Sequence, residues 1–128
     1  MPDPIPFPIT LTFVALCSIA MLPLISWIGL RRAAVQTLHG HGDDPALRRR
    51  IRIHGNFIET APLAILAVWG GELLQFPSLA LWAAVGSFAL GRLLHAALFD
   101  STRRGLAMLF TTGPALFLGV AILIVLWG

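Results

Sequence analysis

The sequence predicts an all-α integral membrane protein, folded as a bundle of four transmembrane helices. Of its 128 residues, 57% are hydrophobic and only 12% are charged, whereas soluble domains carry about 25% charged residues. Four segments are each long and apolar enough to cross a bilayer as a helix, which takes roughly 20 residues. The low charge argues against a disordered chain, and the single cysteine excludes a disulfide scaffold.

We treat residues 1–128 as a single domain with helices at about 9–30, 45–71, 76–99 and 105–127. The first and fourth segments contain no charged residue. Before the second, Asp43 or Asp44 precedes Pro45, a pattern typical of a helix cap with proline at the first helical position. The third follows a short turn that ends at Pro77.

The orientation follows from the basic residues. All nine are arginines, and all but Arg92 lie in the first or the third connection. The positive-inside rule therefore predicts that these two connections are cytoplasmic and that both termini lie on the other side. The high pI of about 11.1 is explained by these arginines, so we expect no nucleic-acid partner.

Ionisable residues inside a membrane helix indicate a functional site, because they are costly to bury there. In the second helix, Arg52, Asn56 and Glu59 fall within about 60° of one face. In the third helix, Arg92 and His95 share a face. Since Glu59 and Arg92 both lie roughly 10 Å inside the cytoplasmic edge, the sequence predicts that they meet.

Two interpretations of these polar residues remain open. The pair of Glu59 and Arg92 could be a purely structural ion pair. Alternatively, the polar side chains line one pocket for a small anion with several charges and one amine, in which arginines bind carboxylates and Glu59 binds the ammonium. Arg31 and Arg32 also fit a topological role at the cytoplasmic end of the first helix. No residue pattern indicates a metal site.

Two runs of sequence are similar to those of a known family. Residues 52–62 read RIHGNFIETAP, and residues 91–99 read GRLLHAALF. The first resembles the second-helix signature of the MAPEG superfamily (membrane-associated proteins in eicosanoid and glutathione metabolism), in which an arginine is followed by Asn-x-x-Glu-x-x-Pro. The second resembles its third-helix signature. The chain resembles a bacterial-type member over its whole length.

This resemblance implies a homotrimer in the bacterial inner membrane, with glutathione bound between neighbouring protomers near the cytoplasmic face. Arg104 matches the arginine that activates the glutathione thiol, with Arg103 as the alternative, and Arg32 matches an arginine that assists the acceptor substrate. This chain has no tyrosine, so the residue at position 99 cannot donate a phenolic hydrogen bond. The glutathione-binding positions are matched by Arg52, His54, Asn56, Glu59, Arg92, His95 and Phe99.

The implied function is that of a glutathione-dependent membrane enzyme, a transferase or a peroxidase, with glutathione as co-substrate and no metal. Arg104 would stabilise the thiolate, which attacks a lipophilic electrophile or reduces a lipid hydroperoxide that enters from the membrane lipids. One alternative is a small four-helix membrane transporter, although the first span lacks the carboxylate typical of such proteins. Another is a non-catalytic lipid-binding or structural trimer.

Overall fold

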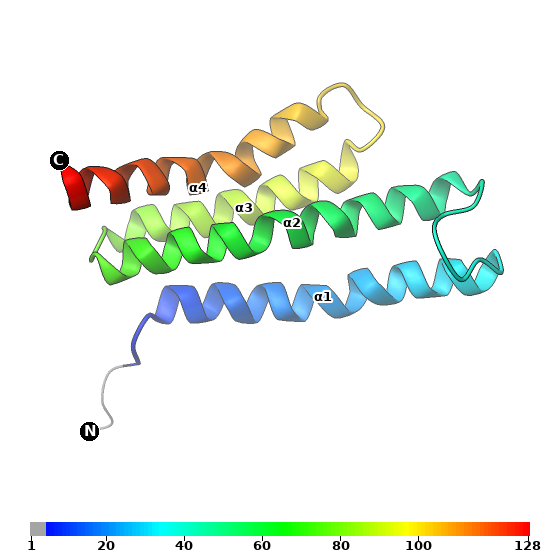
Figure 1. Ribbon diagram of the computed structural model, residues 1–128, viewed down its shortest axis with the longest axis horizontal. Coiled ribbons are helices and arrows are strands. Elements are labelled where there is room, and N and C mark those ends of the chain that lie inside the picture. Colours follow the sequence, from blue (N-terminus) through cyan, green and yellow to red (C-terminus); the bar gives the residue numbers. More distant parts are fainter. Residues whose placement is uncertain (1–4) are drawn as a thin grey trace.

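The computed structural model describes residues 5–128, and it is all-helical (Figure 1). The elements are α1 (Pro8–Ala34), α2 (Pro45–Leu73), α3 (Ser78–Ala97) and α4 (Arg104–Trp127). The helical fold class predicted by the sequence is thus confirmed. Some bounds differ from those expected, since α1 continues to Ala34, α2 continues to Leu73, and α3 begins later and ends earlier than 76–99.

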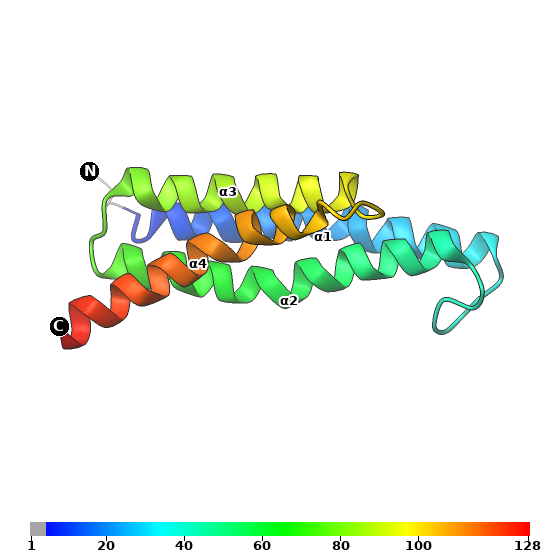
Figure 2. The ribbon, with the colours of Figure 1, turned by 90° about the horizontal axis from the view of Figure 1, so that it is seen from above.

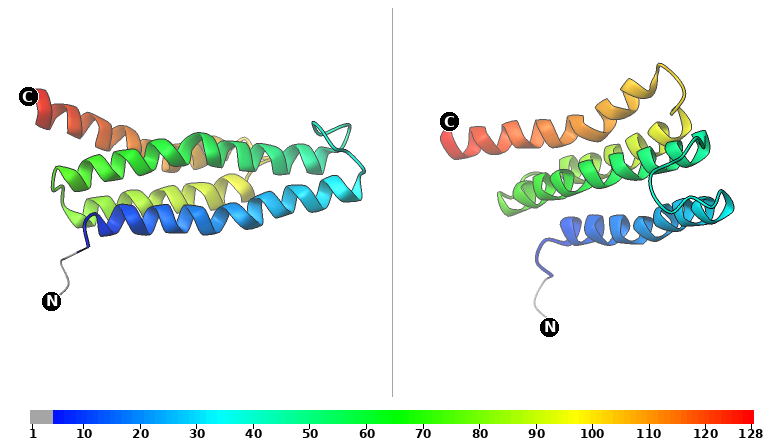
Figure 3. Two further views of the ribbon diagram at one scale, coloured as in Figure 1. Left: turned by 60° about the horizontal axis from the view of Figure 1, so that its bottom comes forward. Right: turned by 45° about the vertical axis from the view of Figure 1, so that its right-hand side comes forward.

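The helices alternate in direction, so the connections fall at two ends. Residues 35–44 and 98–103, the two arginine-flanked connections, lie at one end, and the turn 74–77 lies at the other with the start of α1 and the end of α4 (Figure 1). Helices α1 and α4 lie on opposite sides of the α2–α3 pair and do not contact each other in the described part of the chain (Figures 1 and 3). The bundle is therefore open rather than closed.

Helices α1, α3 and α4 are each long and apolar enough to cross a membrane. Helix α2 has 29 residues, but arginines in its first turns lower its average apolarity. Figure 2 shows that α1 and α2 extend beyond α3 and α4 at the arginine-rich end. The outer surface carries many exposed leucine, isoleucine and valine side chains. This is the surface expected of a protein solvated by lipid.

The core is built from three phenylalanines and a stripe of alanines. The Phe88 ring meets the Phe13 and Phe57 rings edge to face, at centroid distances of 5.2 and 6.2 Å. These contacts join α1, α2 and α3, and rings in this arrangement attract one another beyond simple burial. Small residues on α2, including Ala61 and Ala64, let its neighbours approach closely.

The start of α1 is capped by a residue from the far end of α2. Its N-cap position, Phe7, offers no side-chain cap. Instead the Glu72 carboxylate accepts hydrogen bonds from the backbone amides of Ile9 and Thr10, each 2.9 Å, and from the Thr10 hydroxyl at 2.7 Å. A carboxylate at a helix N-terminus is favoured by the free amides and the helix dipole. Glu72 thus fixes α1 to α2.

Helices α3 and α4 approach each other closely at Gly91. A Cβ atom at this position would lie 2.7 Å from the backbone nitrogen of Thr111 and 2.9 Å from the carbonyl oxygen of Ala107. Backbone atoms cannot move aside as a flexible side chain can. The absence of a side chain at Gly91 is therefore what allows this packing.

We predict that Gly91→Ala lowers the free energy of unfolding by about 1–3 kcal/mol, because it forces α3 and α4 apart. Gly86→Ala is the matched control, since Gly86 lies on the same helix with open space around it. It is expected to be neutral or slightly stabilising. Thermal melting in mild detergent measures both, and equal melting temperatures for the two variants would contradict the packing argument.

Candidate functional site

The first connection is held in place by Asp44. Its carboxylate caps α2 by accepting from the Leu47 amide at 2.5 Å. It also accepts two hydrogen bonds from the Arg31 guanidinium, at 3.2 and 2.6 Å. The Arg31 hydrogen bond, followed by that of the Leu47 amide, holds the pKa of Asp44 below its usual range. These contacts fix the direction in which α2 begins.

Arg32 is also engaged in this connection. Its guanidinium donates to the carbonyl oxygens of Leu38, at 3.2 Å, and Gly40, at 2.8 Å. It lines none of the cavities found in the described part of the chain. Within one protomer, therefore, the structure does not bring Arg32 to the other predicted site residues.

Two arginines of α2 attach that helix to its neighbours. Arg50 donates to the carbonyl oxygen of Trp27 on α1, and its guanidinium lies 4.8 Å from the centre of the Trp27 ring. Arg49 donates to the carbonyl oxygen of Ala96 on α3, at 2.8 Å, and forms an ion pair with Asp100 at 3.3 Å. Both arginines therefore have structural partners.

Three further arginines have no hydrogen-bond or ion-pair partner among residues 5–128, and they converge on one cavity. Arg48 and Arg52 come from α2, and Arg104 comes from the start of α4. The cavity has a volume of about 640 Å³. We call it the arginine cavity, and it is lined by Arg48, Arg52, Asn56, His95, Phe99, Thr102, Arg104, Gly105 and Met108. No carboxylate lines it, so it is suited to an anion.

The inner wall of the arginine cavity is formed by His95, which is buried. The Asn56 amide nitrogen lies 2.8 Å from His95 Nε2, so the amide donates and this ring nitrogen accepts. The Phe99 ring packs edge to face against His95 at a centroid distance of 5.8 Å. Asn56, His95 and Phe99, all predicted site residues, are thus in mutual contact.

The predicted contact between Glu59 and Arg92 is wrong for this protomer. Arg92 turns instead toward α4, where it donates to the Thr111 hydroxyl at 3.1 and 2.7 Å and to the Met108 sulfur at 3.3 Å. Glu59 is exposed and lines a groove between α2 and α4. Arg92 does not line that groove, although its partner Thr111 does, and the two side chains do not meet.

His54 also lies outside the arginine cavity. It is two residues from Arg52, so it projects from a different side of α2. Its Nε2 atom is buried and has no hydrogen-bond partner within residues 5–128. The structure therefore separates His54 from the predicted site residues with which it was grouped.

Sequence reasoning missed four residues that line the arginine cavity: Arg48, Thr102, Gly105 and Met108. One of them had a usable signal. Arg48 precedes Arg52 by four residues and Asn56 by eight, which places all three on one helix face. The others come from the third connection and from α4. The spacing of residues along the sequence does not predict how α4 is rotated about its axis relative to α2 and α3.

Comparison with known proteins gives one match. A model of the MAPEG family matches residues 10–124, which include α2, α3, most of α1 and α4, and every residue that lines the arginine cavity. No curated protein and no solved structure gives a match to the chain. Within residues 5–128, no group of His, Cys, Asp and Glu side chains could hold a metal ion.

The lowered pKa of Asp44 predicts a dependence of stability on pH. Because the folded pKa lies below the unfolded value of about 4, the contribution of Asp44 is fully present above that value. It is lost as the pH falls through the folded pKa. Asp44→Asn should lower the melting temperature at neutral pH by a few degrees and flatten its decline in acid.

The matched control is Asp43→Asn, since Asp43 is an exposed neighbour of Asp44 in the same connection. This variant should melt as the parent does at every pH. Melting curves from neutral to acidic pH test the prediction, and an equal flattening in both variants would contradict it.

Proposed function

We propose that the chain, which belongs to the MAPEG family, is a glutathione-dependent enzyme that acts on a lipophilic substrate. As a member of this family it is an integral membrane protein with four helices. The family includes glutathione transferases and peroxidases. The observation that carries the proposal is the arginine cavity, where three arginines without a protein partner among residues 5–128 face a space free of carboxylates.

Glutathione carries the negative charges that the lining of this cavity lacks. It carries two carboxylates, one ammonium and a thiol, so Arg48 and Arg52 would bind carboxylates through charge-assisted hydrogen bonds. Glu59 lies three residues beyond Asn56 on α2, about 4.5 Å along the helix axis. It is exposed and lines the groove between α2 and α4, from where it would bind the ammonium. His95, held by Asn56, would form the floor.

Arg104 is the residue that would stabilise the glutathione thiolate. It lines the arginine cavity, whereas Arg103 does not. Arg104 is also the first residue of α4, whose first turn contains no acidic residue and has no side-chain cap. The free amides there add to the positive potential. Together these groups would lower the pKa of the bound thiol from about 8.5 toward neutrality.

The thiolate would then react with a substrate dissolved in the bilayer. With an electrophile, its sulfur attacks a carbon atom, a carbon–sulfur bond forms and the leaving group departs. With a lipid hydroperoxide, two glutathione molecules become a disulfide while the peroxide is reduced to an alcohol and water. The apolar outer faces of α1 and α4 would guide such substrates from the lipid. Arg32 and Arg92, expected to assist the acceptor and to bind glutathione, do not line the cavity within one protomer, so we assign them no step inside it.

The arginine cavity lies at the end of the bundle with the arginine-rich connections. By the positive-inside rule this end faces the cytoplasm of a bacterium, and the termini face the other side of its inner membrane. The alternative of a small transporter gains no support, since α1 contains no acidic residue. No observation on the described residues favours a non-catalytic role over the enzyme.

We further propose a homotrimer, because one protomer leaves its polar surface uncovered. Arg52 and Glu59 are exposed on α2, although both belong to the face proposed to bind glutathione. No residue of α1 lines the arginine cavity, and α1 does not contact α4 in the described part of the chain. A neighbouring protomer that covers the cavity would complete the site.

The proposal predicts that Arg104→Ala abolishes the ultraviolet absorbance of the thiolate that forms when glutathione binds. Turnover with a generic electrophile should fall at least tenfold for the same reason. Affinity for glutathione should stay within a few-fold, because its carboxylates and ammonium are held elsewhere. Difference spectroscopy of the detergent-solubilised protein measures the thiolate, and calorimetry measures the affinity.

The matched control is Arg103→Ala, which removes the neighbouring charge from outside the cavity. This variant should retain both the thiolate signal and turnover. Loss of the signal in Arg103→Ala alone would assign the role to Arg103. If both variants keep the thiolate signal, arginine activation at the start of α4 is wrong.

The trimer is tested separately by native mass spectrometry in mild detergent. We expect a dominant species of three 13.8 kDa chains, because the polar face of α2 needs a partner. A stable monomer or dimer across a series of detergents would contradict this assembly.

A further inference from the structure

Helix α4 contains a proline near its middle, Pro114. A proline has no backbone N–H, so the carbonyl oxygen of Phe110, four residues earlier, receives no hydrogen bond from that position of the helix. Proline is a common cause of helix bends, and α4 changes direction about halfway along its length (Figures 1 and 3). Inside a bilayer a backbone carbonyl without a partner is costly, because no water is there to bind it.

Ser87 on α3 supplies the missing donor. Its hydroxyl donates to the Phe110 carbonyl oxygen at 2.7 Å. A helical serine can instead bond a carbonyl of its own helix, as Ser18 does with Val14 at 2.8 Å. Ser87 therefore joins two helices at the bend of α4, about one turn from the close approach at Gly91.

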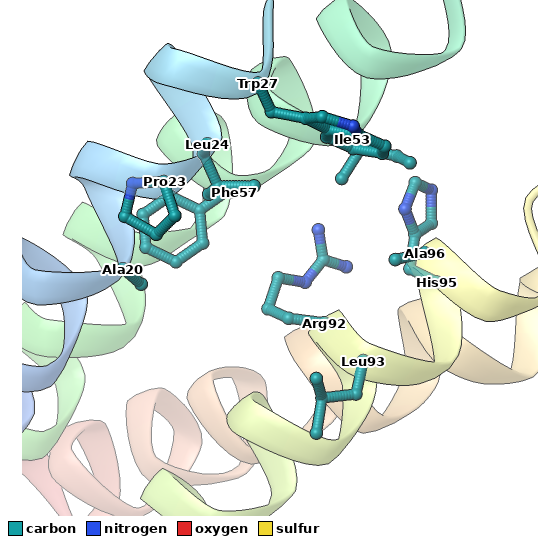
Figure 4. Close-up of a pocket in the computed structure, with 10 residues that line it drawn as sticks. All are labelled: Ala20, Pro23, Leu24, Trp27, Ile53, Phe57, Arg92, Leu93, His95 and Ala96. Atoms are coloured by element: carbon teal, nitrogen blue, oxygen red, sulfur yellow. The ribbon is translucent and has the colours of Figure 1, made fainter. Parts of the chain in front are cut away.

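Arg92 holds the same stretch of α4, through the hydroxyl of Thr111, the neighbour of Phe110. Arg92 and His95 also border a second, mostly apolar cavity of about 530 Å³ between α1 and α3 (Figure 4). A change at Arg92 would therefore disturb that cavity as well as α4. Ser87 lines none of the cavities found in the described part of the chain, so any effect it has on the candidate site passes through α4.

The part of α4 before the bend forms one wall of the arginine cavity, with Arg104, Gly105 and Met108. Arg104 lies ten residues before Pro114, which is about 15 Å along the helix axis. Over that length, a change of about 20° in the bend moves Arg104 by about 5 Å. Such a displacement is larger than the roughly 3 Å of a hydrogen bond. The bend therefore determines whether the guanidinium reaches a ligand in the cavity.

We infer that Ser87 is a positioning residue for Arg104, because its hydrogen bond at the bend of α4 holds that arginine in the arginine cavity. The inference rests on the proposed function, in which Arg104 stabilises the glutathione thiolate. It adds that this stabilisation depends on a hydroxyl group of α3 that does not itself contact glutathione.

The position of the start of α4 is measured without glutathione. In a Cys17→Ser background, spin labels on cysteines introduced by Leu30→Cys and Arg103→Cys report the distance from the end of α1 to the start of α4. Labelled chains are diluted with unlabelled chains, so that distances between chains do not contribute. We expect Ser87→Ala to shift or broaden this distance by about 3–5 Å. The matched control, Ser18→Ala, should leave it unchanged.

A Pro114→Ala background tests whether the proline is the reason that Ser87 matters. This substitution restores an amide donor for the Phe110 carbonyl oxygen. Adding Ser87→Ala should then change the distance little further. An equal effect of Ser87→Ala with and without Pro114 would overturn the inference, because the hydrogen bond at the bend would not be its cause.

Glutathione then tests the consequence for Arg104. Ser87→Ala should move the absorbance of the bound thiolate to higher pH and leave the affinity for glutathione nearly unchanged. Turnover should fall at least about threefold, the effect expected for one hydrogen bond between membrane helices. A bond that only stabilises the fold would lower the melting temperature without moving the pH profile.

An unchanged distance or an unchanged pH profile in Ser87→Ala would overturn the inference. If the parent protein forms no thiolate at any pH, the proposed function is wrong. The distance measurement then still decides whether Ser87 places Arg104, so the two proposals fail separately.

Discussion

This chain has nine arginines but only six acidic residues, so not every arginine at or inside the bilayer can pair with a carboxylate. The arrangement of the helices depends on which partners the arginines contact. Arg31 binds Asp44, Arg49 binds Asp100, and Arg50 packs on Trp27. These contacts attach α2 to α1 and to the end of α3. The arginines that remain without a protein partner in the described part of the chain are then directed at cavities or lie at the exposed start of α4.

His95 separates two cavities of different chemistry. On one side, charged and polar residues from α2, α3 and α4 surround a space near the arginine-rich end. On the other, an apolar space between α1 and α3 contains a single arginine, Arg92. Both exist because the bundle is open, with α1 and α4 held apart by the α2–α3 pair. The separation fits the proposed function, in which one substrate comes from water and the other from lipid.

The sequence was informative wherever a signal lies within one helix. Periodicity placed Arg52 and Asn56 on one face of α2, and both line the same cavity. It did not reveal which neighbour a long side chain would choose, so Arg92 was expected to meet Glu59 but binds Thr111 and Met108 on α4 instead. The same limit applies to Glu72, whose role as the cap of α1 depends on residues more than sixty positions away.

The most direct test of the central claim compares an arginine that has a structural partner with one that has none. Glutathione binding to the detergent-solubilised protein would be measured by calorimetry for Arg52→Ala and for Arg50→Ala, with melting curves to confirm folding. We expect Arg52→Ala to weaken binding at least tenfold, or about 1.4 kcal/mol, and Arg50→Ala to leave the affinity within a few-fold. Equal affinities in the two folded variants, or no saturable binding to the parent protein, would contradict the claim that the unpartnered arginines hold glutathione.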